Sequence, residues 1–361
     1  MHKKTCRILS IDGGGVRGII PALWLEEIEK IVRTNYRQSL LQHFDYLAGT
    51  SAGSIIATSL AAGLQPRQIV DLFENRSREI FPYRFAFDPR RLGLIFKYGL
   101  SAPKYSDKGL SRVLREEIGD TVVADVTDTR LLVPFYDTIK RDAEFVKSYH
   151  DAAHRNHLKF GDVPLWEVAA CSASGPTYFP AHPLRTAGRL YSAIDGGVAV
   201  NNPTACAVAD ALGDGYAPEN IKVLSLGTGS CARSITLRDA RERGTIEWAL
   251  LKLHDLFIDA QQDVHRYIAE RMVGKQNILR LQFRTDNDIV ADLGVEEDIT
   301  NAGKGNLRIL REAAQRMMVQ WHERGLLEEF FDKPAPKPPP YPSRLWKTLG
   351  TTAARIIDRI L

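Results

Sequence analysis

The pentapeptide Gly-Thr-Ser-Ala-Gly around Ser51 constrains the fold more than any other stretch of this chain. The apolar residues 44–48 before it predict a short buried strand, and the small residues 54–62 after it predict a helix. A serine at such a junction, with Gly49 and Gly53 on either side, is the pattern of a nucleophile elbow. Ser51 is therefore a candidate nucleophile, and the alternative is a turn needed only for packing.

The size and charge of the chain set broad limits on its organisation. With 361 residues, 44% of them hydrophobic, it is long enough for one large α/β domain or two ordinary ones. The net charge of +4 is small for this length, so composition gives no case for binding DNA or RNA. The four cysteines are scattered, which argues against a zinc site and a disulfide framework.

The N-terminal residues 1–6 run directly into a predicted strand and leave no apolar region for a signal peptide. No run of about 20 apolar residues is present, so no membrane span is predicted. Together with the scattered cysteines, these features lead us to expect a cytoplasmic protein.

A glycine-rich turn follows the first predicted strand, residues 7–11, and precedes a predicted helix, residues 19–32. Such a turn directs several backbone N–H groups towards one point, which suits an anion. Gly13, Gly15 and Gly18 also fit the dinucleotide-binding fingerprint, which requires an acidic residue at the end of the next strand. Two functions therefore compete for this turn.

The next strand ends in the serine turn and not in an acidic residue. The simpler interpretation is that the glycine turn supplies an oxyanion hole for Ser51. Its donors would be the amides of Gly13, Gly14 and Gly15, with Arg17 as electrostatic support. A purely structural glycine turn is the remaining alternative.

A candidate base lies at the end of another predicted strand, residues 189–194. Asp195 follows this strand and is itself followed by Gly196 and Gly197, so its carboxylate can point from a tight turn into a cleft. Asp-Gly is also a common turn signal without any catalytic role.

Predicted strands and helices alternate along most of the chain, which is typical of an α/β fold with helices on both faces of a sheet. Loops at the carboxyl ends of the strands would then bring the glycine turn, Ser51 and Asp195 together. The sequence thus predicts one site at this edge.

Four motifs occur in the order found in the patatin-like phospholipases, and the chain resembles that family over roughly residues 7–230. They are Asp-Gly-Gly-Gly-Val-Arg-Gly at 12–18, Gly-Thr-Ser-Ala-Gly at 49–53, Ala-Ser-Gly-Pro-Thr-Tyr-Phe-Pro at 173–180 and Asp-Gly-Gly at 195–197. The resemblance implies the three-layer patatin-like fold with a mostly parallel central sheet.

The resemblance also implies a Ser/Asp dyad, with Ser51 as nucleophile, Asp195 as base and the first glycine turn as oxyanion hole. Members of the family hydrolyse acyl esters of lipids without a metal, so no catalytic cofactor is expected. The expected substrate is membrane phospholipid, reached from the inner face of the membrane. A homo-oligomer is left open.

An aspartate near its reference pKa of about 4 is a weaker base than imidazole, so Asp195 would have to be close to the serine and partly desolvated. A Ser-Asp-His triad is the mechanistic rival. His254 and His265 follow Asp195 in the order that α/β-hydrolases use. Both fall in the middle of a predicted helix, residues 245–272, where a triad histidine would be unusual.

The resemblance extends to bacterial patatin-like effectors that cyclic nucleotides activate in anti-phage defence. It implies a cyclic dinucleotide as activator, with Arg84, Arg90, Arg91 and Lys97 as candidate contacts. The alternatives are a constitutive lipid acyl hydrolase of general metabolism and a catalytically silent lipid- or nucleotide-binding module.

Two further stretches leave their roles open. Residues 81–99 mix aromatic and basic side chains without a clear period, which fits a lid or interfacial contact and equally an ordinary packed excursion. His150, His154 and His157 are close enough in sequence to bind a metal, but we expect solvated loop histidines.

We expect three parts along the chain. Residues 1–332 form the phospholipase domain, residues 333–342 form a stiff proline-rich linker, and residues 343–361 form a basic amphipathic tail. The tail would lie on an anionic membrane, dock on another subunit or pack on its own domain.

Overall fold

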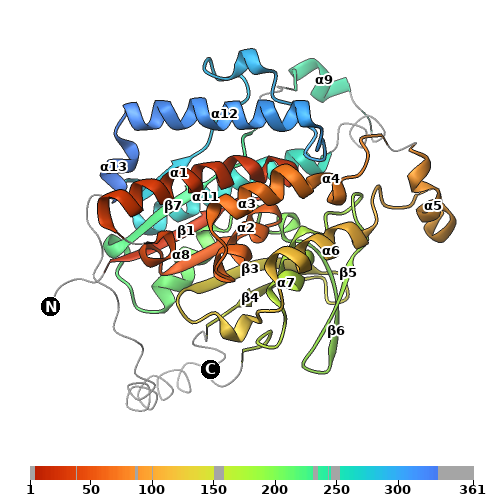
Figure 1. The fold of residues 1–361 in the computed structure, drawn as a ribbon, viewed down its shortest axis with the longest axis horizontal. Coiled ribbons are helices and arrows are strands. Elements are labelled where there is room, and N and C mark those ends of the chain that lie inside the picture. Colours follow the sequence, from red (N-terminus) through yellow and green to blue (C-terminus); the bar gives the residue numbers. More distant parts are fainter. Residues whose placement is uncertain are drawn as a thin grey trace.

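Eight strands among the described residues form one mixed sheet in the order β5-β6-β3-β2-β1-β7-β8, with β4 paired to β3 (Figure 1). The computed structural model describes residues 5–37, 39–85, 88–99, 101–149, 158–230, 235–242, 244 and 253–331. The strands are β1 (Cys6–Ile11), β2 (Tyr46–Gly49), β3 (Arg130–Asp137), β4 (Asp142–Lys147), β5 (His182–Thr186), β6 (Arg189–Asp195), β7 (Ile221–Leu226) and β8 (Ile278–Leu281).

The centre of the sheet is parallel and one edge is antiparallel. Strand β1 lies between β2 and β7, and all of the pairs from β3 to β8 through β1 are parallel. Strands β4 and β6 both pair antiparallel with β3, and β5 pairs antiparallel with β6. The parallel strands therefore end at one edge, as the sequence predicts.

Both faces of the central strands are buried because their apolar residues alternate between two cores. In β1, Leu9 and Ile11 belong to the larger core, whereas Cys6 and Ile8 belong to the smaller one on the opposite face. Such double burial requires helices on both sides of the sheet.

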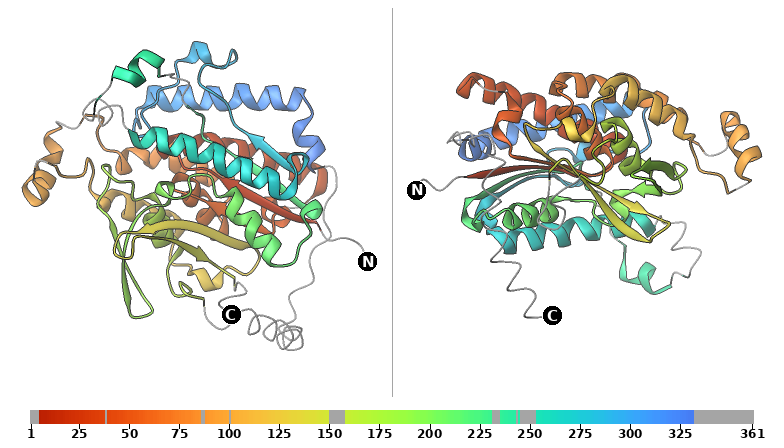
Figure 2. Two further views of the ribbon diagram at one scale, coloured as in Figure 1. Left: turned by 180° about the vertical axis from the view of Figure 1, so that it is seen from behind. Right: turned by 90° about the horizontal axis from the view of Figure 1, so that it is seen from below.

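The helices provide this cover in two layers (Figure 2). The larger core packs α1, α2, α7 and α12 against one face, and the smaller core packs α8 and α11 against the other. The helices are α1 (Ile19–Tyr36), α2 (Ala52–Ala61), α3 (Pro66–Asp71), α4 (Ser77–Ile80), α5 (Leu92–Tyr98), α6 (Asp107–Ile118), α7 (Leu165–Ala173), α8 (Thr204–Gly213), α9 (Leu237–Glu242), α11 (Leu253–Val273), α12 (Lys304–Glu323) and α13 (Leu326–Phe331). This arrangement confirms the predicted three-layer α/β fold with a mostly parallel sheet.

Most predicted elements form within a few residues of their expected bounds. Strand β5 and helices α5, α8, α9 and α13 were not predicted. A π-helical turn at Leu72–Arg76 lies between α3 and α4.

Several predictions lie outside the described residues: the histidines at 150, 154 and 157, the first part of the helix expected at 245–272, the linker at 333–342 and the tail at 343–361. Within the described residues, no helix combines the length and apolar character needed to cross a membrane.

Candidate active site

The turn between β2 and α2 holds Ser51 in a strained backbone conformation. Its φ is 52° and its ψ is −120°, a region that non-glycine residues rarely adopt. The flanking glycines are sterically required, because a Cβ at Gly49 would lie 2.2 Å from the carbonyl oxygen of Gly53. A Cβ at Gly53 would lie 2.2 Å from the carbonyl oxygen of Ile11. The turn therefore has the backbone of a nucleophile elbow.

Asp195, at the end of β6, lies in direct hydrogen-bond contact with Ser51. The Ser51 hydroxyl donates to Asp195 Oδ2 at 2.6 Å. The other carboxylate oxygen accepts from the Gly197 amide at 2.7 Å, and the Asp195 amide donates to the Ser174 carbonyl at 3.0 Å. The carboxylate is thus fixed on both sides, with one oxygen left for the serine.

The environment of Asp195 makes it a better base than an exposed aspartate. Burial raises its pKa from 3.8 to about 6, while the hydrogen bonds from Ser51 and Gly197 oppose the rise. A base works best when its pKa lies near the operating pH, so the shift favours proton transfer from serine.

The glycine loop after β1 lies against the serine turn. A Cβ at Gly13 would come within 3.0 Å of Ser51 Cβ, so only glycine allows this approach. Gly15 has a positive φ of 57°, and a Cβ there would lie 2.3 Å from the Ile299 carbonyl oxygen. A Cβ at Gly14 would lie 2.2 Å from Thr228 Oγ1.

The amides of this loop are not equivalent. The Gly13 amide donates to the Asn201 carbonyl at 3.2 Å. Within the described residues, no acceptor bonds the amides of Gly14 and Gly15. Among the three predicted donors, Gly14 and Gly15 therefore retain N–H groups that a bound anion could use. Arg17, the predicted electrostatic support, lies buried in the short 3-10 helix Gly15–Gly18.

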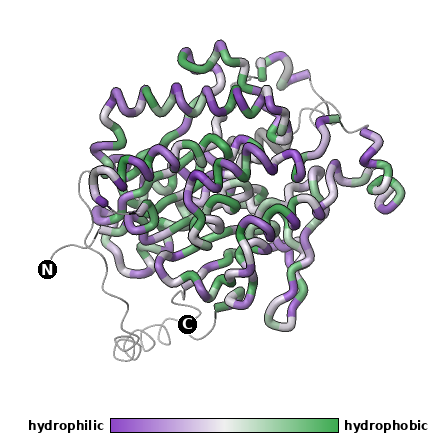
Figure 3. Tube along the Cα trace, in the orientation of Figure 1, coloured by the Kyte–Doolittle hydropathy of each residue, from purple (hydrophilic) through white to green (hydrophobic). Residues whose placement is uncertain are grey.

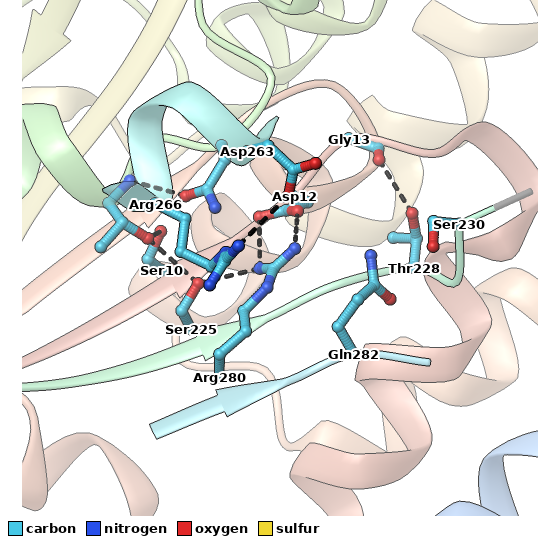
Figure 4. Close-up of polar contacts among 12 residues, drawn as sticks. Ser10, Asp12, Gly13, Ser225, Thr228, Ser230, Asp263, Arg266, Arg280 and Gln282 are labelled. Atoms are coloured by element: carbon cyan, nitrogen blue, oxygen red, sulfur yellow. Dashed lines mark hydrogen bonds and ion pairs between the residues drawn. The ribbon is translucent and has the colours of Figure 1, made fainter. Parts of the chain in front are cut away.

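Hydrogen bonds between the loops fix their relative positions. The Thr50 hydroxyl donates to the Val200 carbonyl at 2.8 Å, and the Ser51 amide donates to Ser172 Oγ at 3.0 Å. The Thr228 hydroxyl donates to the Gly13 carbonyl at 2.9 Å (Figure 4). The serine turn, the aspartate turn and the glycine loop are thereby joined into one rigid edge.

Sequence analysis did not predict the contribution of Arg280, in β8. Its guanidinium binds both carboxylate oxygens of Asp12, the first residue of the glycine loop, and also donates to Ser225 Oγ at 2.9 Å (Figure 4). Asp12 is fully buried, and burial raises its pKa while the Arg280 guanidinium opposes that rise. The pair anchors the start of the loop.

Strand register explains why these distant residues meet. Arg280 pairs with Ser225 across β8 and β7, and Ser225 pairs with Ser10 across β7 and β1. Asp12 lies two residues beyond Ser10, so it projects from the same face of the sheet. Thr228 was also missed, although the Gly-Thr-Gly sequence at 227–229 marks a tight turn after a buried strand and could have indicated it.

The sequence left two alternatives to the Ser/Asp dyad or beside it: a triad with a histidine, and a metal site. His254 and His265 both lie within α11, and the serine hydroxyl contacts Asp195 directly. No group of His, Cys, Asp and Glu side chains in the described ranges could hold a metal ion. The histidines at 150, 154 and 157, which we expect to be solvated loop residues, lie outside those ranges.

Comparison with known proteins gives one family. Residues 9–208 match the model described as patatin-like phospholipase. A cGAMP-activated phospholipase from Vibrio cholerae is 27% identical, over 93% of this chain and 97% of the relative. A second cGAMP-activated phospholipase, from Escherichia coli, is 26% identical, over 93% of this chain and 95% of that relative. Patatin-like protein 2 from Oryza sativa subsp. indica is 27% identical, over 84% of this chain and 82% of that relative.

The family model covers more than half of the chain and includes the glycine loop, the serine turn and the aspartate turn. This match favours the hydrolase interpretation of the glycine loop over the dinucleotide-binding one. The chain belongs to the patatin-like phospholipase family.

Proposed function

We propose that the chain is a serine acyl hydrolase that cleaves fatty-acyl esters of membrane phospholipids through a dyad of Ser51 and Asp195. The observation that carries this proposal is the 2.6 Å hydrogen bond between the two side chains at a strained strand-to-helix turn. Membership of a phospholipase family supports the same reaction class. An intact serine, aspartate and glycine loop also weigh against a catalytically silent binding module.

The reaction begins when Ser51 Oγ attacks the ester carbonyl carbon and its proton passes to Asp195 Oδ2. The amides of Gly14 and Gly15 donate to the resulting oxyanion, supported by the N-terminus of α2. As the tetrahedral intermediate collapses, the bond to the glycerol oxygen breaks. Asp195 returns the proton to that oxygen, which leaves as the alcohol of a lysophospholipid.

Deacylation repeats these steps with water. Asp195 takes a proton from water, the hydroxide attacks the acyl carbonyl, and Ser51 Oγ leaves as the proton returns to it. The products are a free fatty acid and the original enzyme. No metal or other cofactor enters this scheme.

The relatives favour regulation of this activity by a nucleotide. Two of them are named cGAMP-activated phospholipases and align with most of this chain. A cyclic dinucleotide is therefore the proposed activator, in a role in antiviral defence at the inner face of the membrane. A constitutive hydrolase of general lipid metabolism is the alternative.

The test is fatty-acid release from phospholipid vesicles by the purified chain, alone and with a panel of cyclic dinucleotides. Ser51→Ala is the control. Release only with one nucleotide supports the gated phospholipase, whereas release without any nucleotide supports the constitutive enzyme. No release under any of these conditions would overturn the proposed function.

A further inference from the structure

The aromatic and basic segment at residues 81–99 divides into two parts with opposite environments. In the first part, Phe81 and Tyr83 pack against Tyr105, with ring centroids 5.5 Å and 5.1 Å apart. Phe179 completes this cluster at 5.7 Å from the Phe81 ring. The first part is therefore an ordinary packed excursion, one of the two alternatives that the sequence leaves open.

The second part, from residue 84 onwards, has the opposite character. None of the residues of α5 is buried, although most of them are apolar. Phe96 is 88% exposed, Phe85 is 71% exposed and Leu92 is 53% exposed. Apolar side chains gathered on one exposed projection mark an interaction site, in contrast to surface residues scattered singly. Figure 3 shows this hydrophobic stretch at the outer end of the molecule.

The charges beside these apolar side chains favour an anionic partner. Residues 84–98 contain four cations, Arg84, Arg90, Arg91 and Lys97, and a single carboxylate, Asp88. Asp88 is already paired with Arg90, and Lys97 lies on the α5 helix itself, 4.7 Å from the Tyr98 ring centroid. Aromatic rings interleaved with cations suit the headgroup level of an anionic bilayer.

Contacts at its base hold the projection to the domain. Arg91 donates to the backbone carbonyls of Ala102 and Pro103, and Arg84 pairs with Glu296 at 2.9 Å. Although these bonds attach the segment to the domain, Leu92 and Phe96 of α5 stay exposed and Leu94 and Ile95 are only half-buried.

The projection lies at the end of the molecule where the parallel strands finish. Figures 1 and 2 place α5 at that end in every view, with α9 at the same end. Leu237 of α9 is 76% exposed and adds a further exposed apolar side chain at this end of the molecule. An enzyme that takes its substrate from a bilayer must present its active-site edge to that bilayer, and α5 and α9 lie at the same end of the molecule as this edge.

We propose that α5 and residues 84–91 dock on the surface of an anionic phospholipid bilayer, with Phe85, Leu92 and Phe96 entering the interface. Docking is a binding function separate from ester cleavage, although it brings the active site of the proposed function to its substrate. The competing occupant of this surface is a second copy of the chain.

The test measures binding of the full chain to vesicles by co-sedimentation. One set of vesicles contains phosphatidylglycerol and phosphatidylcholine, and the other contains phosphatidylcholine alone. Phe96→Asp and Leu92→Asp should each weaken binding to the anionic vesicles about tenfold, because burial of a large apolar side chain is lost. Lys97→Glu should weaken it less, and by a smaller factor at high salt.

Control variants come from large apolar residues that are also exposed but lie elsewhere on the surface. Ile139, in the turn between β3 and β4, is 59% exposed, and Val319 on α12 is 57% exposed. Ile139→Asp and Val319→Asp should bind both sets of vesicles like the unaltered chain. Equal losses in the α5 variants and these controls would overturn the proposal.

Hydrolysis gives a second readout that separates docking from cleavage. In Phe96→Asp, the ratio of vesicle hydrolysis to hydrolysis of a soluble short-chain ester should fall about tenfold. Binding unchanged by Phe96→Asp would overturn docking, as would a change from dimer to monomer in sedimentation. A chain that binds vesicles but cleaves neither substrate would instead contradict the proposed function alone.

Discussion

The loops of the active-site edge and the α5 projection lie at the same end of the molecule but are held in opposite ways. The glycine loop donates to the carbonyls of Asn201 and Ile299 and accepts from the Thr228 hydroxyl. The Arg280–Asp12 pair anchors its start. Helix α5 buries none of its residues. The region of the proposed chemistry is thus held by hydrogen bonds between loops, whereas the proposed docking region leaves its apolar side chains in water.

This difference has an energetic basis. Donors and a base that are already in place stabilise developing charge without reorganising during the reaction. Contact with a bilayer requires the opposite, namely apolar area left in water until the partner covers it. Substitutions at the edge should therefore change chemistry and folding, whereas substitutions in α5 should change binding.

The largest effect is expected from Asp195→Asn, which preserves shape but removes the base. We expect kcat/KM for a soluble ester to fall by roughly three to four orders of magnitude. The thermal midpoint at neutral pH should stay equal or rise, because burial disfavours the ionised carboxylate in the folded state. Kinetics and a thermal melt on the same preparation check both expectations, and a loss of activity explained by unfolding would contradict them.

Breaking the anchor of the glycine loop should have the next largest effect. Arg280→Met leaves the buried Asp12 carboxylate without its partner, so we expect the free energy of unfolding to drop by about 3–5 kcal/mol. The activity should fall about a hundredfold as Gly14 and Gly15 lose their positions.

Urea unfolding of Arg280→Met, Asp12→Asn and the double variant measures the coupling. Since the double variant leaves no unpaired charge, it should be more stable than Arg280→Met alone. If the double variant lost the sum of the two single-variant losses in the free energy of unfolding, the Arg280–Asp12 pair would not stabilise the glycine loop.

The pH dependence of activity sharpens the role assigned to Asp195. Only the ionised carboxylate accepts the serine proton, and its pKa is raised to about 6. We therefore expect kcat/KM to be level above that pH and to fall about tenfold for each pH unit below it. A profile measured from pH 4.5 to 8 with a soluble ester tests this, and a flat profile across pH 6 would argue against Asp195 as the base.

The smallest effect on folding is expected in α5. Phe96→Ala should change the free energy of unfolding by no more than about 0.5 kcal/mol, because its side chain is already in water. Phe179→Ala, in the buried aromatic cluster, provides a matched contrast and should cost about 3–5 kcal/mol. Urea unfolding measures both values. Similar losses of free energy in Phe96→Ala and Phe179→Ala would mean that α5 packs on the domain, which would contradict the contrast between the two regions.

Local patterns predicted much of the fold and the candidate site. The central strands are continuous apolar runs, and the serine, aspartate and glycine turns interrupt them with sharp local signals. The sequence predicted that Ser51 and Asp195 lie at one edge of the sheet. Because β6 is antiparallel to β3, Asp195 reaches that edge by pairing with Phe135 near the carboxyl end of β3. Their catalytic roles stay predictions, although their side chains are in contact.

What could not be predicted depends on distant pairing. Arg280 lies 268 residues from Asp12, and only the register of β1, β7 and β8 brings them together. Strand β5 is an edge strand that contains Pro183, so it lacks a buried apolar run. The sequence at 81–99 has no period, so only the fold could separate its packed part from its projecting part.

The most direct test of the central claim is to label the purified chain with an alkyl fluorophosphonate and locate the adduct by peptide mass spectrometry. We expect one phosphonyl group on Ser51, no labelling in Ser51→Ala and much slower labelling in Asp195→Asn. An adduct on another residue, or labelling of Ser51 at the same rate without Asp195, would contradict the Ser51–Asp195 dyad.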